Sequence, residues 1–177
     1  LHYPLRRQRQ MCIRDRCAAC GVKVVISDFE RIREDGKVID ENMTVDQMIA
    51  LGWSPCRVVE ARWRWQEQLL SVVNSRGLLA IVVPDRQHLA ILWNDDDTGV
   101  AATLYVVSGD RQQQIRIADQ LLINGQLEAG IYSWFEQFPQ VSPSIFTCMF
   151  SRQRDQAMFR VDIDASTGDI VSIQHSR

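Results

Sequence analysis

The stretch SPCRVVEARWRWQEQLLSVVNS, residues 54–75, decides the fold that the sequence predicts. Ser54 and Pro55 are typical of a helix start, because serine caps the first amides and proline loses no hydrogen bond at the first helical position. Gly77 is suited to ending that helix. At about 100° per residue, the apolar side chains cover an arc of roughly 200°. They are Val58, Val59, Ala61, Trp63, Trp65, Leu69, Leu70, Val72 and Val73. So broad an arc indicates a long helix packed on two sides.

Other segments predict two further helices and a set of strands. Thr44 and Gln47 form a capping box that opens a short helix, and Gly52 ends it. After Asn124-Gly125, apolar side chains recur on one helical face and predict a second helix. They are Leu127, Ile131, Trp134, Phe135 and Phe138. Strands are predicted at 21–26, 78–83, 88–93, 100–107, 114–118, 145–151, 157–163 and 169–174.

Short turns join most of these strands, which favours antiparallel pairing. The sequence therefore predicts a single α+β domain over residues 17–177. We expect an antiparallel sheet of about six to seven strands, packed against the long helix and a second, shorter helix.

Residues 1–16, LHYPLRRQRQMCIRDR, resemble the translation of a sequencing-library adapter. We expect them to make no packed structure, and the native chain to begin near Cys17 with its own N-terminus missing. The whole chain has 20 basic and 22 acidic residues. Residues 1–16 hold five arginines and one aspartate, which leaves 15 basic against 21 acidic residues, a net charge of −6. This acidic balance disfavours nucleic acid as a partner.

Four cysteines follow residue 16, namely Cys17, Cys20, Cys56 and Cys148. Their uneven spacing is not typical of a disulfide framework, so free thiols and a cytoplasmic location are favoured. A signal peptide stays open, because the segment that would carry it is missing. Cys17 and Cys20 have the spacing of a zinc knuckle, but a structural zinc site needs four ligands and no second pair follows. We expect no metal and no cofactor. No apolar run reaches the ~18–20 residues of a transmembrane helix.

Arg62 and Gln66 are the candidate ligand-binding residues, since both fall inside the apolar arc, one helical turn apart. A guanidinium there must reach water or meet an acceptor, and a carboxylate suits it best. The two side chains would then present donors to an anion in a cleft between helix and sheet.

A nucleophilic thiol would need Cys148 paired with His88 or His175. Cys148 lies in the apolar strand sequence IFTCMF, which favours an inert core thiol. Three consecutive acids, Asp95 to Asp97, are typical of a solvated hairpin turn.

Residues 159–173, FRVDIDASTGDIVSI, resemble the last hairpin of PepSY-type domains, and no family is assigned from so short a stretch. The sequence favours a non-enzymatic binding or interaction domain whose partner is a protein or a small ligand. The alternative is a small hydrolase or transferase with a cleft near Arg62, Gln66, Cys148 or His175. An enzyme would need at least two titratable groups converging within hydrogen-bond reach in a concave pocket.

Overall fold

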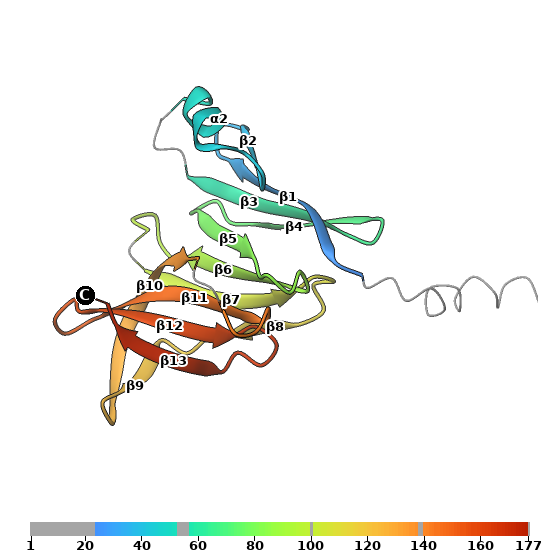
Figure 1. Ribbon diagram of the computed structural model, residues 1–177. Helices are drawn as coiled ribbons and strands as arrows, with labels where there is room; N and C mark the ends of the chain where they lie inside the picture. The colour runs from blue at the N-terminus through green and yellow to red at the C-terminus, as the bar shows by residue number, and fades with distance from the viewer. Residues whose placement is uncertain (1–23, 53–56, 100, 138–139, 177) are drawn as a thin grey trace, which may run out of the picture.

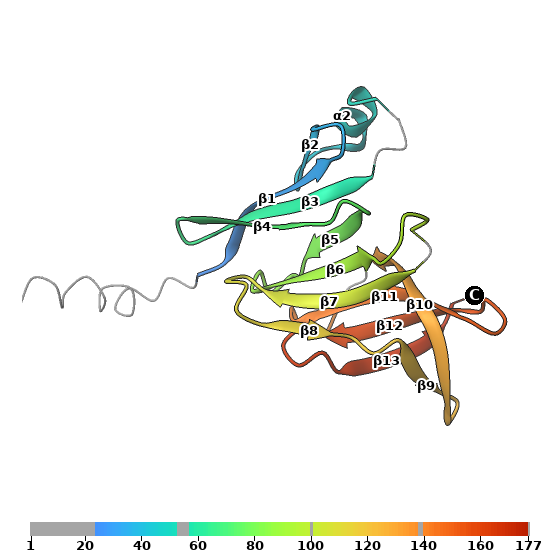
Figure 2. The ribbon, with the colours of Figure 1, turned by 180° about the vertical axis from the view of Figure 1, so that it is seen from behind.

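The structure is a computed structural model that describes residues 24–52, 57–99, 101–137 and 140–176. These residues form thirteen strands and one short helix, α2 (Val45–Ala50). Every strand pair is antiparallel, and the strands make three sheets (Figure 1, and from behind Figure 2). The architecture is therefore almost entirely β, and the predicted α+β class is wrong. The sixteen adapter-like residues, Cys17, Cys20 and Cys56 lie outside the described residues.

The first sheet has the strand order β2-β1-β3-β4. Its strands are β1 (Ile26–Arg33), β2 (Val38–Asp40), β3 (Val58–Trp65) and β4 (Gln68–Val73). Helix α2 follows β2 and lies at the outer end of this sheet (Figure 1). The predicted capping box is confirmed: Thr44 Oγ1 accepts the Gln47 amide at 3.3 Å, and Gln47 Oε1 accepts the Thr44 amide at 2.8 Å.

The middle sheet follows chain order, β5-β6-β7-β8. Its strands are β5 (Leu78–Val82), β6 (His88–Asn94), β7 (Ala102–Ser108) and β8 (Gln114–Arg116). The turn between β5 and β6 is organised by Asp85, whose carboxylate accepts the amides of Gln87 at 2.8 Å and His88 at 3.3 Å. The four strands predicted for this region are confirmed to within about two residues at each end.

The third sheet has the order β13-β12-β11-β10-β9. Its strands are β9 (Gln120–Ile123), β10 (Gln126–Glu136), β11 (Ile145–Arg152), β12 (Met158–Asp164) and β13 (Ile170–His175). The last three match the predicted strands. The predicted strand at 21–26 reaches the described chain only at its end, where β1 begins.

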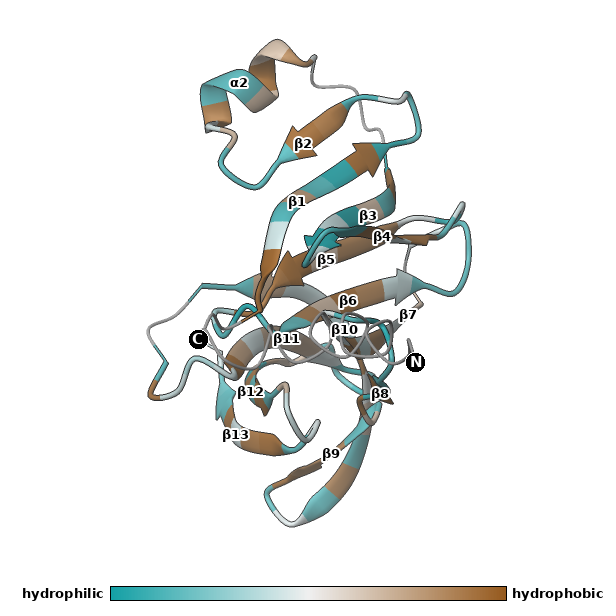
Figure 3. Ribbon diagram, turned by 90° about the vertical axis from the view of Figure 1, so that its right-hand side faces the viewer, coloured by the Kyte–Doolittle hydropathy of each residue, from teal (hydrophilic) through white to brown (hydrophobic). Residues whose placement is uncertain are grey.

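The three sheets stack, so that the middle sheet is covered on both faces (Figure 3). Strand β6 shows this most clearly, because Leu89, Ala90, Ile91 and Leu92 are all at most 2% exposed. Leu89 and Ile91 join a core shared with the first sheet, whereas Ala90 and Leu92 join a larger core shared with the third sheet. A strand buried on both faces is a continuous apolar run, as this one is.

The predicted long helix is a hairpin of β3 and β4, with Gln66 and Glu67 at the turn. Side chains of a strand alternate between its faces, and here Trp63 is fully buried while its neighbours Arg62 and Arg64 point to the other face. The apolar side chains alternate with the period of two of a strand. Placed at the 100° per residue of a helix, they spread over a broad arc. Leu69 and Val73 belong to the apolar arc that a helix packed on two sides would bury, but they are 55% and 60% exposed.

The predicted second helix is also wrong, since its described part forms β10, a strand of eleven residues. Asn124 and Gly125 have φ angles of 52° and 78°, which is the left-handed pair that a two-residue hairpin turn requires. They therefore join β9 to β10 instead of leading into a helix. Phe138, assigned to that helical face, lies outside the described residues.

Replacing Gly130 on β10 by alanine should lower the free energy of unfolding by about 1–3 kcal/mol, the usual cost of overpacking. An added Cβ would overlap the Phe150 ring, which is fully buried, and the backbone carbonyl oxygen of Ser151. Neither group is free to move aside. Chemical denaturation of the two proteins measures the difference, and equal midpoints would show that β10 shifts without cost.

Candidate binding groove

A groove of about 660 Å³ lies between the first sheet and the part of the middle sheet that the first sheet leaves uncovered. Its lining residues are Ser71, Val72 and Val73 of β4, Trp93 of β6, Tyr105 of β7, Arg111, and Gln114 of β8. The alternation of the middle strands explains the composition. Trp93 and Tyr105 point to the same face as Ile91 and Val107. Ile91 and Val107 are buried in the core shared with the first sheet, whereas Trp93 packs against that core and stays half-buried, and Tyr105 is also half-buried.

Several polar groups in this groove have no partner among the described residues. Four side chains of the lining form no hydrogen bond or ion pair with the part of the chain that is described. Their polar groups are the Trp93 Nε1 atom, the Tyr105 hydroxyl, the Arg111 guanidinium and the side-chain amide of Gln114. Tyrosine and tryptophan combine a large apolar body with one polar tip, which suits a surface that contacts both apolar and polar parts of a ligand.

The turn between β7 and β8 fixes where Arg111 stands. The Arg111 amide donates to the Ser108 carbonyl at 2.8 Å, and Arg111 itself has a left-handed φ of 61°. Ser108 Oγ donates to Asp110 at 2.6 Å and accepts the Gln113 amide at 2.9 Å. The Ser108 hydrogen bond, with the Gln112 amide, holds the pKa of Asp110 below its usual value. The backbone that carries Arg111 is thus well anchored.

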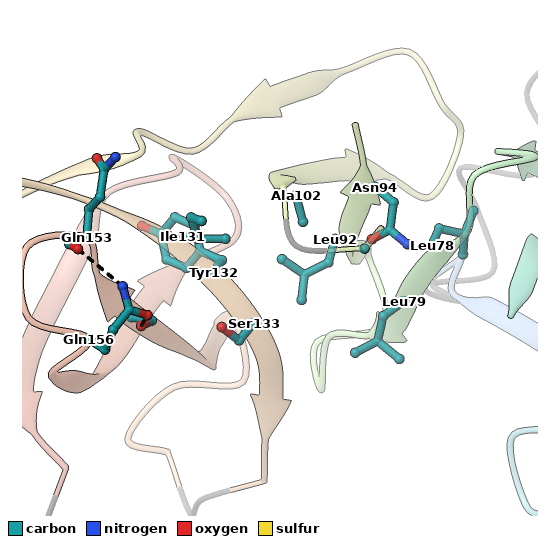
Figure 4. A pocket seen from close by; sticks show the side chains of 12 residues that line it. Leu78, Leu79, Leu92, Asn94, Ala102, Ile131, Tyr132, Ser133, Gln153 and Gln156 are labelled. Atoms are coloured by element: carbon teal, nitrogen blue, oxygen red, sulfur yellow. Dashed lines mark hydrogen bonds between the residues drawn. The ribbon is translucent and has the colours of Figure 1, made fainter. Parts of the chain in front are cut away.

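A second cleft, of about 330 Å³, opens between the middle and third sheets (Figure 4). Leu79 and Leu92 line one side of it, and Ile131 and Ser133 of β10 line the other. The remaining lining residues are Leu78, Asn94, Gly99, Ala102, Tyr132, Ser151, Gln153 and Gln156. The lining includes no carboxylate, imidazole, thiol or cationic side chain, so it offers packing and hydrogen bonds without charge.

A polar cluster occupies the outer face of the third sheet around Asp162, which is 6% exposed. Thr147 Oγ1 and Ser172 Oγ donate to its two carboxylate oxygens, each at 2.6 Å. Arg160 donates at 3.3 Å and Gln140 at 3.4 Å. Burial by itself raises the pKa of Asp162, but the hydrogen bonds from Ser172, Thr147 and Arg160 outweigh burial and hold this pKa below its usual value. The carboxylate is occupied on both oxygens, which fits a structural role.

Gln140 and Thr147 of this cluster also line a third cleft, of about 350 Å³. Its other walls come from β5, the end of β10 and the start of β11, and they are mostly apolar. Glu136 is the one ionisable side chain in this lining, and it already accepts the Trp134 Nε1 hydrogen bond at 2.8 Å.

The structure does not bring the predicted pair Arg62 and Gln66 together in one of these clefts. Arg62 lies on β3, where its Nε and Nη2 atoms are each 3.2 Å from Glu60 Oε1. The guanidinium thus meets a carboxylate, which is one of the two environments considered for it, but that carboxylate belongs to the same strand. Gln66 is at the β3–β4 turn with a φ of 56°, and neither residue lines any of the three clefts. The helical spacing that brought them together does not exist.

Cys148, His88 and His175 each contact different residues. Cys148 is fully buried, its Sγ donates to the Trp134 carbonyl at 3.3 Å, and burial raises the pKa of its thiol far above the usual value. His88 Nδ1 lies 2.7 Å from Asp85, and the His175 ring packs edge-on against Phe159 at 5.1 Å. No hydrogen bond joins the thiol to an imidazole in the described segments.

Metal-ligating side chains do not gather within residues 24–52, 57–99, 101–137 and 140–176, where no group of three His, Cys, Asp or Glu side chains has a suitable arrangement. Cys17 and Cys20, which have the spacing of a zinc knuckle, fall outside these ranges. The acidic side chains of the turn after β6 hold the hairpin together by hydrogen bonds. Asp96 accepts the amides of Thr98 and Gly99 at 2.9 and 3.1 Å, and Asp95 accepts the Thr103 hydroxyl at 2.7 Å.

Comparison with known proteins does not assign this chain to a family. No protein-family model matches this chain, and no curated protein matches it. No helix among the described residues is long and apolar enough to cross a lipid bilayer.

The groove residues Trp93, Tyr105 and Arg111 were not predicted as functional. The strands that carry Trp93 and Tyr105 were predicted. Which half of the middle sheet remains uncovered depends on how far the first sheet extends over it. A strand pairing of β6 with β7 would have placed Trp93 and Tyr105 on one face, and this was the available signal.

Proposed function

We propose that this chain is a non-enzymatic binding or interaction module, and that the groove lined by Trp93, Tyr105, Arg111 and Gln114 holds its partner. The observation that carries the proposal is the set of aromatic and cationic side chains without partners in a concave surface. Tryptophan, tyrosine and arginine are the residue types that contribute most to binding energy at protein interfaces. A protein or peptide partner is therefore favoured over a small polar metabolite.

The chemistry of the lining also favours binding over catalysis. Its two ionisable groups are the Arg111 guanidinium and the Tyr105 phenol. The lining contains no carboxylate, imidazole or thiol, which are the groups that most often transfer protons or attack a substrate. The groove instead offers apolar area, hydrogen-bond donors and one positive charge.

The test selects peptides from a displayed library of random twelve-residue sequences on the folded protein, and measures the affinity of the best peptide by fluorescence anisotropy. Tyr105→Ala should weaken binding by about tenfold or more, as expected for an aromatic residue at the centre of an interface. Trp93→Ala should act in the same direction.

Trp134→Ala is the matched control, because Trp134 is 43% exposed on β10 and lies outside the groove. Its affinity for the peptide should equal that of the unaltered protein. Thermal unfolding of each variant establishes that it is folded. Peptides whose affinity is the same for Tyr105→Ala and the unaltered protein would contradict the groove as the binding site.

A further inference from the structure

Strand β4 is the last strand of the first sheet and pairs with β3 on one side only. The backbone groups on its other, unpaired edge face the groove. The Asn74 amide donates to the Val59 carbonyl at 2.8 Å, which makes Asn74 a hydrogen-bonded partner of β3. Hydrogen-bonded and non-hydrogen-bonded residues alternate in an antiparallel pair. Leu69, Ser71 and Val73 therefore direct their backbone N–H and C=O groups to the free edge. Ser71 and Val73 line the groove.

This edge lacks the features that normally prevent another strand from pairing with it. Exposed edges are usually short, or carry charge, proline or a bulge. Strand β4 has six residues, the sequence QLLSVV without charge or proline, and a regular register with β3. In contrast, the opposite edge strand β2 has three residues and ends in Asp40. The edge of the middle sheet at β8 also has three residues and ends in Arg116.

An added strand at this edge would cover the exposed part of the middle sheet. Strands β1 and β3 pack over β5, so β4 and any strand beyond it extend toward β7 and β8. A new strand would lie about 4.8 Å from β4, and its layer about 10 Å above the middle sheet. Its inward side chains would thus meet Tyr105 and Gln114, which no strand of the described first sheet covers.

We propose that β4 accepts an extended peptide segment of a partner protein as a fifth strand of the first sheet. Main-chain hydrogen bonds to Leu69, Ser71 and Val73 would supply affinity, and alternate side chains would supply specificity. The segment carries an apolar side chain that packs on Tyr105 and Trp93. It also carries a carboxylate for Arg111, because Arg111 is the one charged side chain of the lining and has no partner among the described residues. This inference rests on the proposed function of the groove.

The first experiment is an N-methyl scan of the peptide chosen from the displayed library. N-methylation removes one backbone donor at a time. Methylation at every second position, where the amide faces β4, should weaken binding by about tenfold, and methylation at the intervening positions should change it by less than about threefold. Loss of affinity without this period of two would contradict strand addition.

The second experiment blocks the edge of the protein. Ser71→Pro removes an amide that faces the groove, and proline is tolerated at such edge positions because no existing ladder bond is lost. We expect peptide affinity to fall at least about tenfold. Leu122→Pro is the matched control: the Gly130 amide donates to Asp119, so the same alternation places the Leu122 amide on the free edge of β9, in the third sheet. Its affinity should be unchanged.

The third experiment exchanges the charge. Arg111→Glu should weaken binding of the selected peptide by about tenfold, and a peptide with lysine in place of its acidic residue should recover that loss of affinity on Arg111→Glu.

Analytical ultracentrifugation of the unaltered protein tests whether a second copy of this chain occupies the edge instead. Self-association that Ser71→Pro abolishes would show that a second copy of this chain fills the edge, and would overturn the proposal.

The outcomes separate the two proposals. Strand addition would be contradicted if Tyr105→Ala weakens peptide binding, Ser71→Pro leaves the affinity unchanged, and N-methylation shows no period of two. The groove would then still be a binding site. Peptides that ignore Tyr105 would contradict the proposed function itself.

Discussion

Replacing Trp63 by alanine should lower the free energy of unfolding by about 3–5 kcal/mol, the usual cost of truncating a buried tryptophan. Trp63 is the largest fully buried side chain of the described residues, and it lies in the core shared by the first and middle sheets. Its Nε1 donates to the Gly109 carbonyl at 2.7 Å. Truncation would therefore remove both apolar contacts and the hydrogen bond that ties β3 to the end of β7.

Chemical denaturation followed by far-UV circular dichroism measures this loss. Trp134→Ala serves as the control, since its indole is 43% exposed and its truncation should cost less than about 1 kcal/mol. A similarly small effect at Trp63 would mean that the first sheet does not pack on the middle sheet in solution. In that case the groove between them would lose one of its walls.

The error over residues 54–75 has a specific physical cause. Ser54, Pro55 and Gly77 are local helix signals, and the stretch between them contains no glycine, proline or asparagine before Asn74. The actual turn is at Gln66, which adopts a φ of 56° although glutamine has no preference for it. The alternation of Arg62, Trp63 and Arg64 was the better indicator, because a period of two is the mark of a half-buried strand.

Strands flanked by strong turn residues were predicted well. Pro84-Asp85 and the glycine-containing turns near 99, 109 and 168 interrupt the chain where hairpins turn, so the strands between them could be recognised locally. Stacking was a different matter. The continuous burial of β6 depends on two other sheets, and residues far along the chain supply them.

The candidate site depended on the same long-range information. Arg62 and Gln66 were grouped by a helical spacing, and the strand geometry separates them. Trp93 and Tyr105 were brought together by the pairing of β6 with β7 and by the limited reach of the first sheet. Sequence alone identifies the strands that carry them, but not which layer covers them.

Replacing Asp162 by alanine should lower the free energy of unfolding by about 2–4 kcal/mol at pH 7, because buried donors would lose their common acceptor. Thr147 is 1% exposed and donates to Asp162 at 2.6 Å. Ser172 donates to the other carboxylate oxygen, also at 2.6 Å, and thereby ties β13 to β12. Asp162→Asn keeps one acceptor oxygen and the size of the side chain, so its cost should be smaller.

The same pair of proteins yields a pH dependence whose sign follows from the lowered pKa of Asp162. In the unfolded chain an aspartate titrates near pH 3.9, and in the folded protein this carboxyl titrates at a lower pH. The stabilisation from the charged form is therefore complete above about pH 4, and is lost as the pH falls through the folded-state pKa. The stability difference between the unaltered protein and Asp162→Asn should stay constant from about pH 5 to 8 and shrink on acidification. Other acidic groups titrate in both proteins and cancel in the difference. A difference that grows below pH 4 would mean that the neutral carboxyl is the form that the cluster of Thr147, Ser172 and Arg160 stabilises.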